Sequence, residues 1–482
     1  MKFGHLLICS AALAGSAFAI SGSGLGAPGS TRSVLSVVAG ASQDSSSSSD
    51  GNSDVPTSVF NLAKTILGAG VLSLPSGVAA FSDQVSGLAP ASALLLAMGI
   101  ISAYSFASIG RACRLHDTRG FSDAWAKSVG PSTAGIISSV ITFKTFFACL
   151  AYSIIIGDSF TSLFKSFGFS GVSRSQVILG LTSLVIFPLC MLKNMDALKT
   201  TSILGLGGIA YCALFMTVRL FDGSYRAGGK YFADLAAAVR PSFGARTSAP
   251  QPHVIFVLIS MISTAYVAHY NAPKFWVELK NKTEARYKTV VASAFGFAFA
   301  MYMTVMWTGF LTFGGHSTGF VLNNYSSKDK FATFARLCIG LAILFGYPLT
   351  FSALREGAFD LLRIPPAGAS VDGGNRRAKL ATPATVILMA LITALALVLK
   401  NVGIVVSFSG ALIGAMLIYT VPAIMNISDL RAAKKCVGKG KPSSTYTKQE
   451  LLELVANYGM ALMGCVIAVI GVATTLIGAS AH

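Results

Sequence analysis

The sequence predicts an all-α polytopic membrane protein with about eleven membrane-spanning helices. Three observations support this fold class. Hydrophobic residues make up 53% of the chain, only 12% of residues are charged, and the mean hydropathy is +0.66. Apolar stretches recur along the chain at about the 20-residue length that crosses a bilayer. The basic residues lie mainly in short loops between these stretches, so the net charge of +18 indicates membrane orientation and not nucleic-acid binding.

The expected spans follow one another after a polar N-terminal region. They are 58–81, 87–110, 134–164, 174–192, 201–221, 252–277, 288–314, 331–354, 381–400, 403–426 and 455–478. Alternate loops differ in charge, because one set holds about twice as many lysines and arginines as the other. That set is 111–133, 193–201, 278–288, 355–380 and 427–454. This asymmetry predicts that the segment before the first span lies on the cytosol-like side and that the C-terminus lies opposite.

The N-terminal region carries targeting features. Residues 1–20 have the lysine, the short apolar run and the small residues of a signal peptide, and 21–57 resemble a transit peptide followed by a flexible linker. The residues around Ala17 and Phe18 also resemble the cleavage motif of algae with secondary plastids. An ordinary secretory signal is the alternative, although it would deliver the linker to the lumen. Two locations therefore remain open: the plastid envelope of a secondary-plastid alga, and an endomembrane or vacuolar membrane. Residues 58–478 form the transmembrane domain.

The first span has a predicted interruption. Its middle contains Gly68, Ala69 and Gly70, and Pro75 follows, so we expect two half-helices with an open join. In hydrocarbon such a join is tolerated where it lines a protected cavity. The freed amides of Gly68 to Val71 would then bind a carboxylate at the positive end of a half-helix. The alternative is that the glycines only allow close helix packing.

The sixth span is the expected partner of the first. If spans 1 to 5 and 6 to 10 form an inverted repeat, span 6 should also be interrupted, and the polar stretch from Ser260 to Asn271 before Pro273 is the expected place. Its carbonyls, around Ser263, Thr264 and Ala265, would meet a substrate ammonium group. The alternative is a kinked helix whose hydroxyl groups bond back to their own carbonyls.

Five stretches resemble one transporter family. FNLAKTILGAGVLSLP in the first span resembles the signature of the amino acid/auxin permease family, most closely its fungal vacuolar and sodium-coupled neutral amino acid transporter branches. KTFFACLAYSIIIGD, His269 with Asn271 and the ELK at 278–280, TFGGHSTGFVLNNY, and YPL at 347–349 with Arg355 are similar to family patterns in the right order. The resemblance implies a leucine-transporter-like fold of five-plus-five helices and one extra helix, with an amino acid bound between spans 1 and 6. Thr65 joins the candidate substrate residues on this basis.

The coupling ion is where the chain departs from its sodium-coupled relatives. Those relatives carry Asn at the position of Lys64 and Thr at the position of Gly346, both associated with the cation site. A fixed ammonium group and a missing side-chain oxygen both disfavour sodium. We therefore expect proton coupling or sodium-independent exchange, unless Lys64 only extends its ammonium group to the interface. The other ionisable candidates near membrane depth are Lys144, Asp158 and His269.

These features predict secondary active transport of neutral or small amino acids, with no enzymatic activity. The expected partners are an amino acid, a coupling ion and the bilayer. An amino-acid sensor that uses a transporter fold is the alternative from another class. The eight cysteines are scattered without a CxxC motif, so we expect no disulfide framework, no metal site and no cofactor. The sequon at Asn324 is a possible glycosylation site if the protein follows the secretory route.

Overall fold

The computed structural model describes residues 51–169, 171–192, 202–245, 252–364, 371–437 and 446–480. Within these ranges the regular structure is helical, joined by loops and turns, and two isolated β-bridges take the place of strands. Eight helices are long and apolar enough to cross a membrane, and a bent helix pair at 55–81 makes a ninth span. Two shorter apolar helices, Arg174–Cys190 and Gly205–Phe221, occupy the positions expected for the fourth and fifth spans. The predicted all-α membrane fold is confirmed. Of the targeting and linker segments expected at 1–20 and 21–57, residues 1–50 lie outside the described residues, and residues 55–57 already belong to the first helix, so the linker ends earlier than expected.

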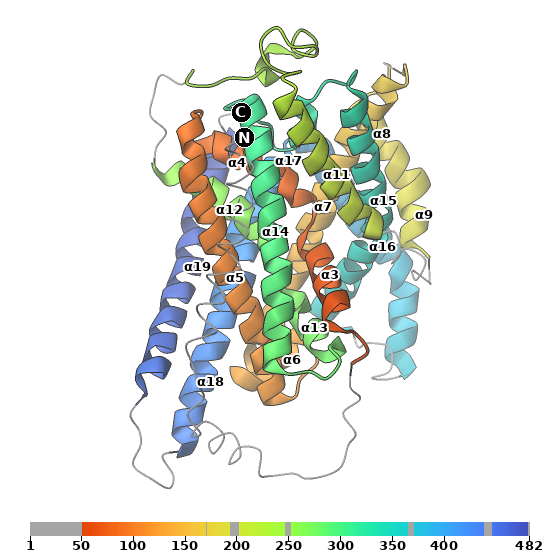
Figure 1. The fold of residues 1–482 in the computed structure, drawn as a ribbon. Coiled ribbons are helices and arrows are strands. Elements are labelled where there is room, and N and C mark those ends of the chain that lie inside the picture. Colours follow the sequence, from red (N-terminus) through yellow and green to blue (C-terminus); the bar gives the residue numbers. More distant parts are fainter. Residues whose placement is uncertain are drawn as a thin grey trace.

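The helices form one upright bundle (Figure 1). The unbroken long helices are α5 (Leu88–His116), α7 (Ala134–Ser166), α14 (Glu284–Phe313), α15 (Lys330–Leu361), α16 (Val371–Val398) and α19 (Lys448–Ser480). Span 10 runs from α17 (Val402–Ser409) through π-helical turns at Gly410–Gly414 and Met416–Thr420 into α18 (Val421–Val437). The shorter helices are α6 (Phe121–Ser128), α8 (Arg174–Leu181), α9 (Phe187–Cys190) and α11 (Ser202–Phe221).

Spans 1 and 6 are both broken near their middle. Span 1 consists of α3 (Val55–Ile66), a 3-10 turn at Ala69–Ser73 and α4 (Leu74–Phe81), and its two halves are bent by 46°. Span 6 consists of α12 (Ile255–Tyr266), a 3-10 turn at His269–Asn271 and α13 (Ala272–Glu278). The predicted interruption of both spans is therefore confirmed.

The two breaks have the same backbone geometry. Leu67, which ends α3, has φ −75° and ψ 87°, and Val267, which ends α12, has φ −74° and ψ 96°. Each break is followed by a 3-10 turn and then by a half-helix with proline in its first turn, Pro75 in α4 and Pro273 in α13. A proline at this place needs no hydrogen bond from its own nitrogen, so it starts the second half-helix without cost. This local agreement is what an inverted repeat of spans 1 and 6 predicts.

The break in span 6 is narrower than expected. The sequence predicts an unwound stretch from Ser260 onward, but the helix continues to Tyr266. The hydroxyl groups of Ser260 and Ser263 donate to the carbonyls of Phe256 and Ile259, at 2.6 and 2.9 Å, within the same helix. These polar side chains are satisfied by helical geometry and do not interrupt it.

The lower end of the bundle in Figure 1 joins the start of span 1 to the end of span 6. The Ser53 amide donates to the Glu278 carbonyl at 2.9 Å, and the Ser53 carbonyl accepts from the Lys280 amide at 2.8 Å. Asp54 then caps α3 by accepting from the Thr57 amide at 3.0 Å. The lower halves of the two broken spans are thus linked through the backbone (Figure 1).

Span 10 holds α12 in place through glycines. A methyl group built on Gly410 would overlap the Ser260 carbonyl and come within 2.5 Å of the Thr264 hydroxyl. One on Gly414 would come 3.1 Å from the Ser263 side chain. Because only glycine fits at this distance, the seam fixes α12 closely against the π-helical turns.

We expect Gly410→Ala to destabilise the protein. Overpacking of a close contact costs about 1–3 kcal/mol, so the unfolding temperature in detergent should fall by several degrees. Gly459→Ala on α19 is the control, because a methyl group there meets no atom within 4 Å. Alanine also favours the helix, so the control should be neutral or slightly stabilising. Equal unfolding temperatures for the two variants would contradict the tight seam.

The sequon at Asn324 is not available in the folded protein. Asn324 is fully buried. Its side-chain amide donates to the His316 carbonyl at 2.8 Å and accepts from the amide and hydroxyl of Thr318 at 2.9 and 2.6 Å. The expectation that Asn324 could be glycosylated is therefore wrong for the folded protein, because its side chain is buried and holds its own loop together.

Candidate functional site

Two of the four amides expected to bind a carboxylate, those of Gly68 and Val71, already have backbone partners. The amides of Leu67 and Gly68 donate to Ala63 and Ile66 at 2.8 and 2.9 Å, and the Val71 amide donates to Gly68 at 3.3 Å. Ala69 and Gly70 lie between Gly68 and Val71 and form the start of the 3-10 turn. The first amides of a helix have no carbonyl partner within that helix, so the start of this turn is where a carboxylate would be bound.

The break in span 6 exposes the carbonyl end of α12. Ser263, Thr264 and Ala265 all lie in the last turn of this helix. The Val267 amide bonds the Thr264 carbonyl at a long 3.4 Å. The Thr264 hydroxyl donates to the Val406 carbonyl of α17 at 2.6 Å, so it anchors α12 to span 10. The Thr65 hydroxyl donates within its own helix, α3, to the Asn61 carbonyl.

A tyrosine of α14 joins the two breaks. The Tyr302 hydroxyl lies 2.8 Å from the Ile66 carbonyl and 2.6 Å from the Ala265 carbonyl. Tyr302 is fully buried, and these carbonyls belong to the last turns of α3 and α12. A hydroxyl group has one proton, so it donates to one of the two carbonyls at a time, and its place between them keeps both half-helix ends beside α14. Because the Ala265 carbonyl has this partner, it is less available to a substrate than the carbonyls of Ser263 and Thr264.

The two breaks face each other with space beside them. A methyl group built on Gly70 would lie 3.8 Å from the Thr264 methyl group, which places the 3-10 turn of span 1 opposite the end of α12. Gly68 is exposed, and a methyl group built on it would meet no atom within 4 Å. The amide end of one broken span and the carbonyl end of the other thus meet beside open space.

Lys64 lies three residues before this break, in the last turn of α3. It is half-buried, and in the part of the chain that the structure describes it forms no ion pair within 4 Å. Another cation, Lys274 of α13, lies near enough to repel it. The ammonium group therefore adds positive charge beside the break.

Lys144 of α7 contacts the break in span 6. Its ammonium group donates to the Tyr270 hydroxyl at 2.9 Å and lies 4.5 Å from the centre of the Tyr270 ring. Tyr270 is the middle residue of the 3-10 turn that follows the break. A charged hydrogen bond and a cation–π contact together fix this turn to α7.

Gly346 lies in α15, on the helix that packs most extensively on α7. A methyl group there would meet no atom within 4 Å. The next residue, Tyr347, is fully buried and its hydroxyl lies 3.2 Å from the Ser153 hydroxyl of α7. The position thus provides room but no side-chain oxygen.

Asp158 lies away from the breaks, whereas His269 belongs to the 3-10 turn of span 6, and both are held by structural contacts. Asp158 accepts from Arg174 at 2.7 Å and from the Asn323 side chain at 2.9 Å, so it ties α7 to α8 and an upper loop. His269 is fully buried, and its Nε2 lies 3.0 Å from the Ser102 carbonyl and 2.8 Å from the Ser105 hydroxyl. Because a carbonyl only accepts, Nε2 carries the proton, and the ring connects span 6 to α5.

Sequence reasoning missed Tyr302 and Tyr270. Both lie in apolar or mixed stretches where an aromatic residue is ordinary, so their hydroxyl groups gave no signal. The hydroxyl group of a buried tyrosine usually has a hydrogen-bond partner. This rule could have marked buried tyrosines as candidate site residues, but it does not predict which group each hydroxyl contacts. Among the described residues, no group of three or more His, Cys, Asp or Glu could hold a metal ion.

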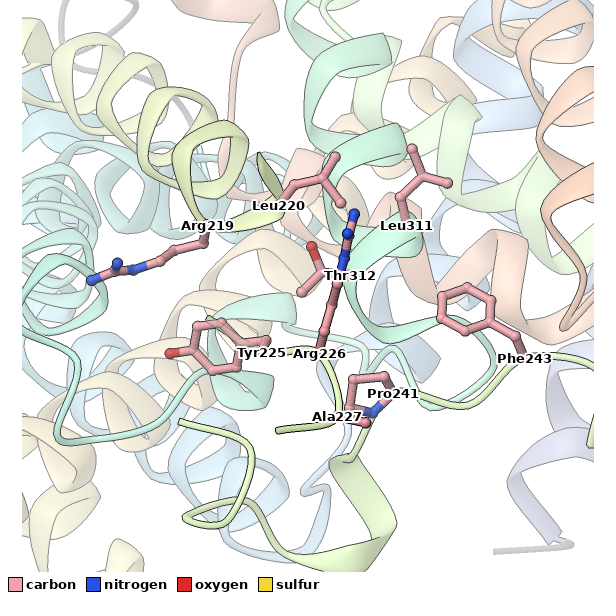
Figure 2. A pocket seen from close by; sticks show the side chains of 9 residues that line it. All are labelled: Arg219, Leu220, Tyr225, Arg226, Ala227, Pro241, Phe243, Leu311 and Thr312. Carbon is pink, nitrogen blue, oxygen red and sulfur yellow. The ribbon is translucent and has the colours of Figure 1, made fainter. Parts of the chain in front are cut away.

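A separate cavity of about 300 Å³ lies at the upper end of the bundle (Figure 2). Its walls come from α11, the end of α14 and the loop between α11 and α12, and the Arg226 side chain extends between Leu220 and Leu311. None of the residues that line it belongs to the two breaks. It is therefore distinct from the candidate substrate site.

Comparisons with known proteins agree with this geometry. The chain is 26% identical over 359 residues to vacuolar amino acid transporter 5 of Schizosaccharomyces pombe, which covers 74% of this chain and 80% of that protein. It is 25% identical over 378 residues to putative sodium-coupled neutral amino acid transporter 11 of Danio rerio, with 77% and 78% covered. The structure is similar to the inward-facing conformation of Mhp1, with a TM-score of 0.50, 11% identity, and 90% and 92% covered.

The structural likeness confirms the leucine-transporter-like fold and shows the fold alone. The family assignment comes from sequence. A model described as transmembrane amino acid transporter protein matches residues 51–477, from the strand-like contact before α3 to the end of α19. The two broken spans, their order in the chain and this match lead to one conclusion: the protein belongs to the transmembrane amino acid transporter family.

Proposed function

We propose that the protein carries out secondary active transport of neutral amino acids by alternating access, with a proton as the coupling ion. The observation that carries the proposal is the pair of facing breaks in spans 1 and 6. A zwitterion needs one partner for its carboxylate and one for its ammonium group, and each break presents one of these at a half-helix end.

The proposed substrate site uses mainly backbone groups. The amides of Ala69 and Gly70 bind the carboxylate, and the positive end of the α4 half of span 1 favours its negative charge. The carbonyls of Ser263 and Thr264 accept from the ammonium group at the negative end of α12. Thr65, Gly68, Val71 and Ala265 form the surrounding backbone. A neutral side chain needs no further charge, which supports neutral amino acids as the substrate class.

The links around the breaks support alternating access. The Tyr302 hydroxyl contacts both half-helix ends, while Ser53 links the start of α3 to the end of α13. The lower halves of spans 1 and 6 are thus connected to each other, whereas α7 and α15 pack extensively on one another and α7 contacts span 6 through Lys144 and Tyr270. Movement of one pair against the other would open the site to either side in turn.

Proton coupling is supported by the charge beside the break. Sodium requires several oxygen ligands, and Gly346 provides no side-chain oxygen. Lys64 adds a fixed positive charge at the break without a recorded carboxylate partner among the described residues. An ammonium group that substitutes for a bound cation, or that releases its proton, removes the need for sodium. Lys144 and His269 are further candidates for proton coupling, because the first contacts and the second belongs to the 3-10 turn of span 6.

We expect uptake into proteoliposomes to follow a pH gradient and to change little with sodium. Purified protein would be tested with a panel of amino acids, under a pH gradient alone and a sodium gradient alone. A sodium requirement would refute the argument from Lys64 and Gly346. Amino acid binding without flux under any gradient would instead favour the sensor function.

The membrane of residence is proposed from relatives. Vacuolar amino acid transporters of yeasts are among the most similar proteins, which supports a vacuolar or other endomembrane location. The plastid envelope remains the alternative suggested by the N-terminal sequence. Localisation of a C-terminally tagged full-length chain would distinguish these two membranes.

A further inference from the structure

A second cavity lies at the upper end of the bundle, on the side that the loop charges predict to be non-cytosolic. Its volume is about 440 Å³, and it opens between the end of α11, the loop after α11 and the start of α15. The residues that line it are Arg219, Lys230, Tyr231, Asp234, Lys328, Lys330 and Phe331. Lysine and arginine are scarce in the loops on this side, so their concentration around one cavity needs a physical reason.

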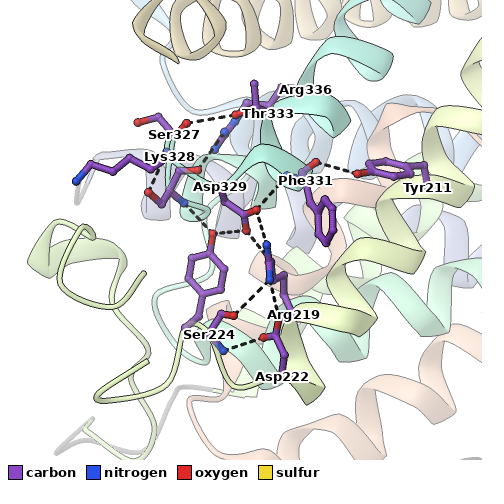
Figure 3. A network of polar contacts seen from close by, with 12 residues as sticks. Tyr211, Arg219, Asp222, Ser224, Ser327, Lys328, Asp329, Phe331, Thr333 and Arg336 are labelled. Atoms are coloured by element: carbon purple, nitrogen blue, oxygen red, sulfur yellow. Dashed lines mark hydrogen bonds and ion pairs between the residues drawn. The ribbon is translucent and has the colours of Figure 1, made fainter. Parts of the chain in front are cut away.

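The floor of the cavity is a rigid ionic network (Figure 3). The Arg219 guanidinium donates two hydrogen bonds of 2.8 Å to Asp329, which is fully buried, and a third of 2.6 Å to Asp222. The Tyr225 hydroxyl donates to Asp329 at 2.9 Å. Burial and the adjacent carboxylate raise the pKa of Tyr225, so its hydroxyl stays protonated and continues to donate. These groups satisfy one another and fix the shape of the site.

Two lysines at the rim have no carboxylate partner within the residues that the structure describes. Lys328 is paired with Asp234 at 2.5 Å. Lys230 contacts the Tyr231 ring, with its ammonium group 5.3 Å from the ring centre, and it has no ion pair within the described part of the chain. Lys330 is the first residue of α15, where the helix dipole adds positive potential, and no ion pair is recorded for it among those residues either. The cavity therefore presents uncompensated positive charge.

An exposed apolar surface continues from the cavity toward the middle of the bundle. Phe331 and Phe334 on α15 are 47% and 50% exposed, and Leu214 and Val218 on the neighbouring α11 are 62% and 42% exposed. Tyr211 connects the two helices, because its ring contacts Phe334 edge-on and its hydroxyl donates to the Phe331 carbonyl at 3.3 Å. Positive charge at the end of the helices with apolar surface directly below it matches a phosphate head group with acyl chains.

We propose that this cavity binds the head group of an anionic phospholipid of the non-cytosolic leaflet. The phosphate lies between Lys230 and Lys330, and the acyl chains follow the surface of Phe331, Phe334 and Leu214. A soluble phosphate compound would use the lysines but would gain nothing from the apolar surface. The continuity of charge and apolar surface therefore favours a lipid.

The test uses full-length protein in nanodiscs with increasing mole fractions of phosphatidylglycerol in phosphatidylcholine. Bound lipid is counted by native mass spectrometry, and the unfolding temperature is measured in parallel. A lysine near a membrane surface contributes enough to change affinity about fivefold. We expect Lys230→Gln with Lys330→Gln to raise the half-saturating mole fraction about twenty-five-fold, and each single variant to raise it about fivefold.

Lys165→Gln is the matched control, since Lys165 is an exposed lysine at the same end of the bundle but outside the cavity. It should leave lipid binding unchanged, and all variants should unfold at the same temperature in pure phosphatidylcholine. Unchanged phosphatidylglycerol binding by the double variant would overturn the proposal. Equal stabilisation of the protein by glycerol phosphate alone would also overturn it, because that result would indicate a site for a soluble anion.

Discussion

Replacing Gly70 with valine should abolish amino acid uptake while the protein still inserts and folds. A methyl group at this position already reaches ordinary van der Waals distance from Thr264, 3.8 Å, so the additional methyl groups of valine would enter the space between the two breaks. They would cover the amides proposed to bind the carboxylate. A misplacement of about 1 Å at a reacting or binding group can cost about 100-fold, and we expect a loss of at least that size.

The measurement is initial uptake in proteoliposomes, with the protein content equalised after reconstitution. Gly70→Ala should retain part of the activity, because its methyl group fits the measured distance. Gly459→Val on α19 is the control for adding the same bulk to a helix, since that position has no atom within 4 Å. If Gly70→Val transports like the unchanged protein, the glycines of span 1 serve only for helix packing.

Replacing Tyr302 with phenylalanine should remove the contact that holds the two breaks together and should reduce both stability and uptake. The change removes the one hydroxyl that lies within hydrogen-bond distance of both the Ile66 and the Ala265 carbonyls. Loss of a buried hydrogen-bond partner costs about 1–3 kcal/mol. We expect the unfolding temperature to fall by a few degrees and uptake to fall at least tenfold, because both half-helix ends lose their common anchor on α14.

Tyr287→Phe is the matched control on the same helix. Tyr287 is also buried, and its hydroxyl donates at 2.9 Å to the carbonyl of Ala272, the first residue of α13, and not to the carbonyl end of α3 or α12. It should lose similar stability but keep most of its uptake. Equal losses of uptake in the two tyrosine variants would show that Tyr302 supports the fold and has no particular role at the breaks.

The candidate ion-coupling residues divide into two groups once the fold is known. Lys64 lies beside the break of span 1, where its positive charge can influence a bound ion. Gly346 lies beside open space and offers no side-chain oxygen to such an ion. Asp158 is committed to Arg174, and His269 is committed to α5. Lys144 lies between these groups, because its partner Tyr270 belongs to the break of span 6. The most direct tests of coupling are therefore at Lys64 and Lys144.

The sequence alone determined that this protein is a multi-span helical membrane protein and that its first and sixth spans are interrupted. Span length, glycine and proline are local properties: about 20 apolar residues suffice to cross hydrocarbon, and Gly68 to Pro75 weaken a helix wherever they occur. The same reasoning overestimated the break in span 6, because serine hydroxyls can satisfy themselves within a helix.

Only the tertiary structure decided which groups meet. Tyr302 lies 236 residues from Ile66 and 37 from Ala265 in the chain, and nothing in its neighbours indicates that its hydroxyl contacts both carbonyls. The burial of Asn324, the contact of Lys144 with Tyr270 and the basic cavity at Lys230 and Lys330 likewise depend on packing between distant helices. A hydrogen bond or an ion pair requires atoms within about 3–4 Å, and that proximity is set by how the helices pack and not by the order of residues along them.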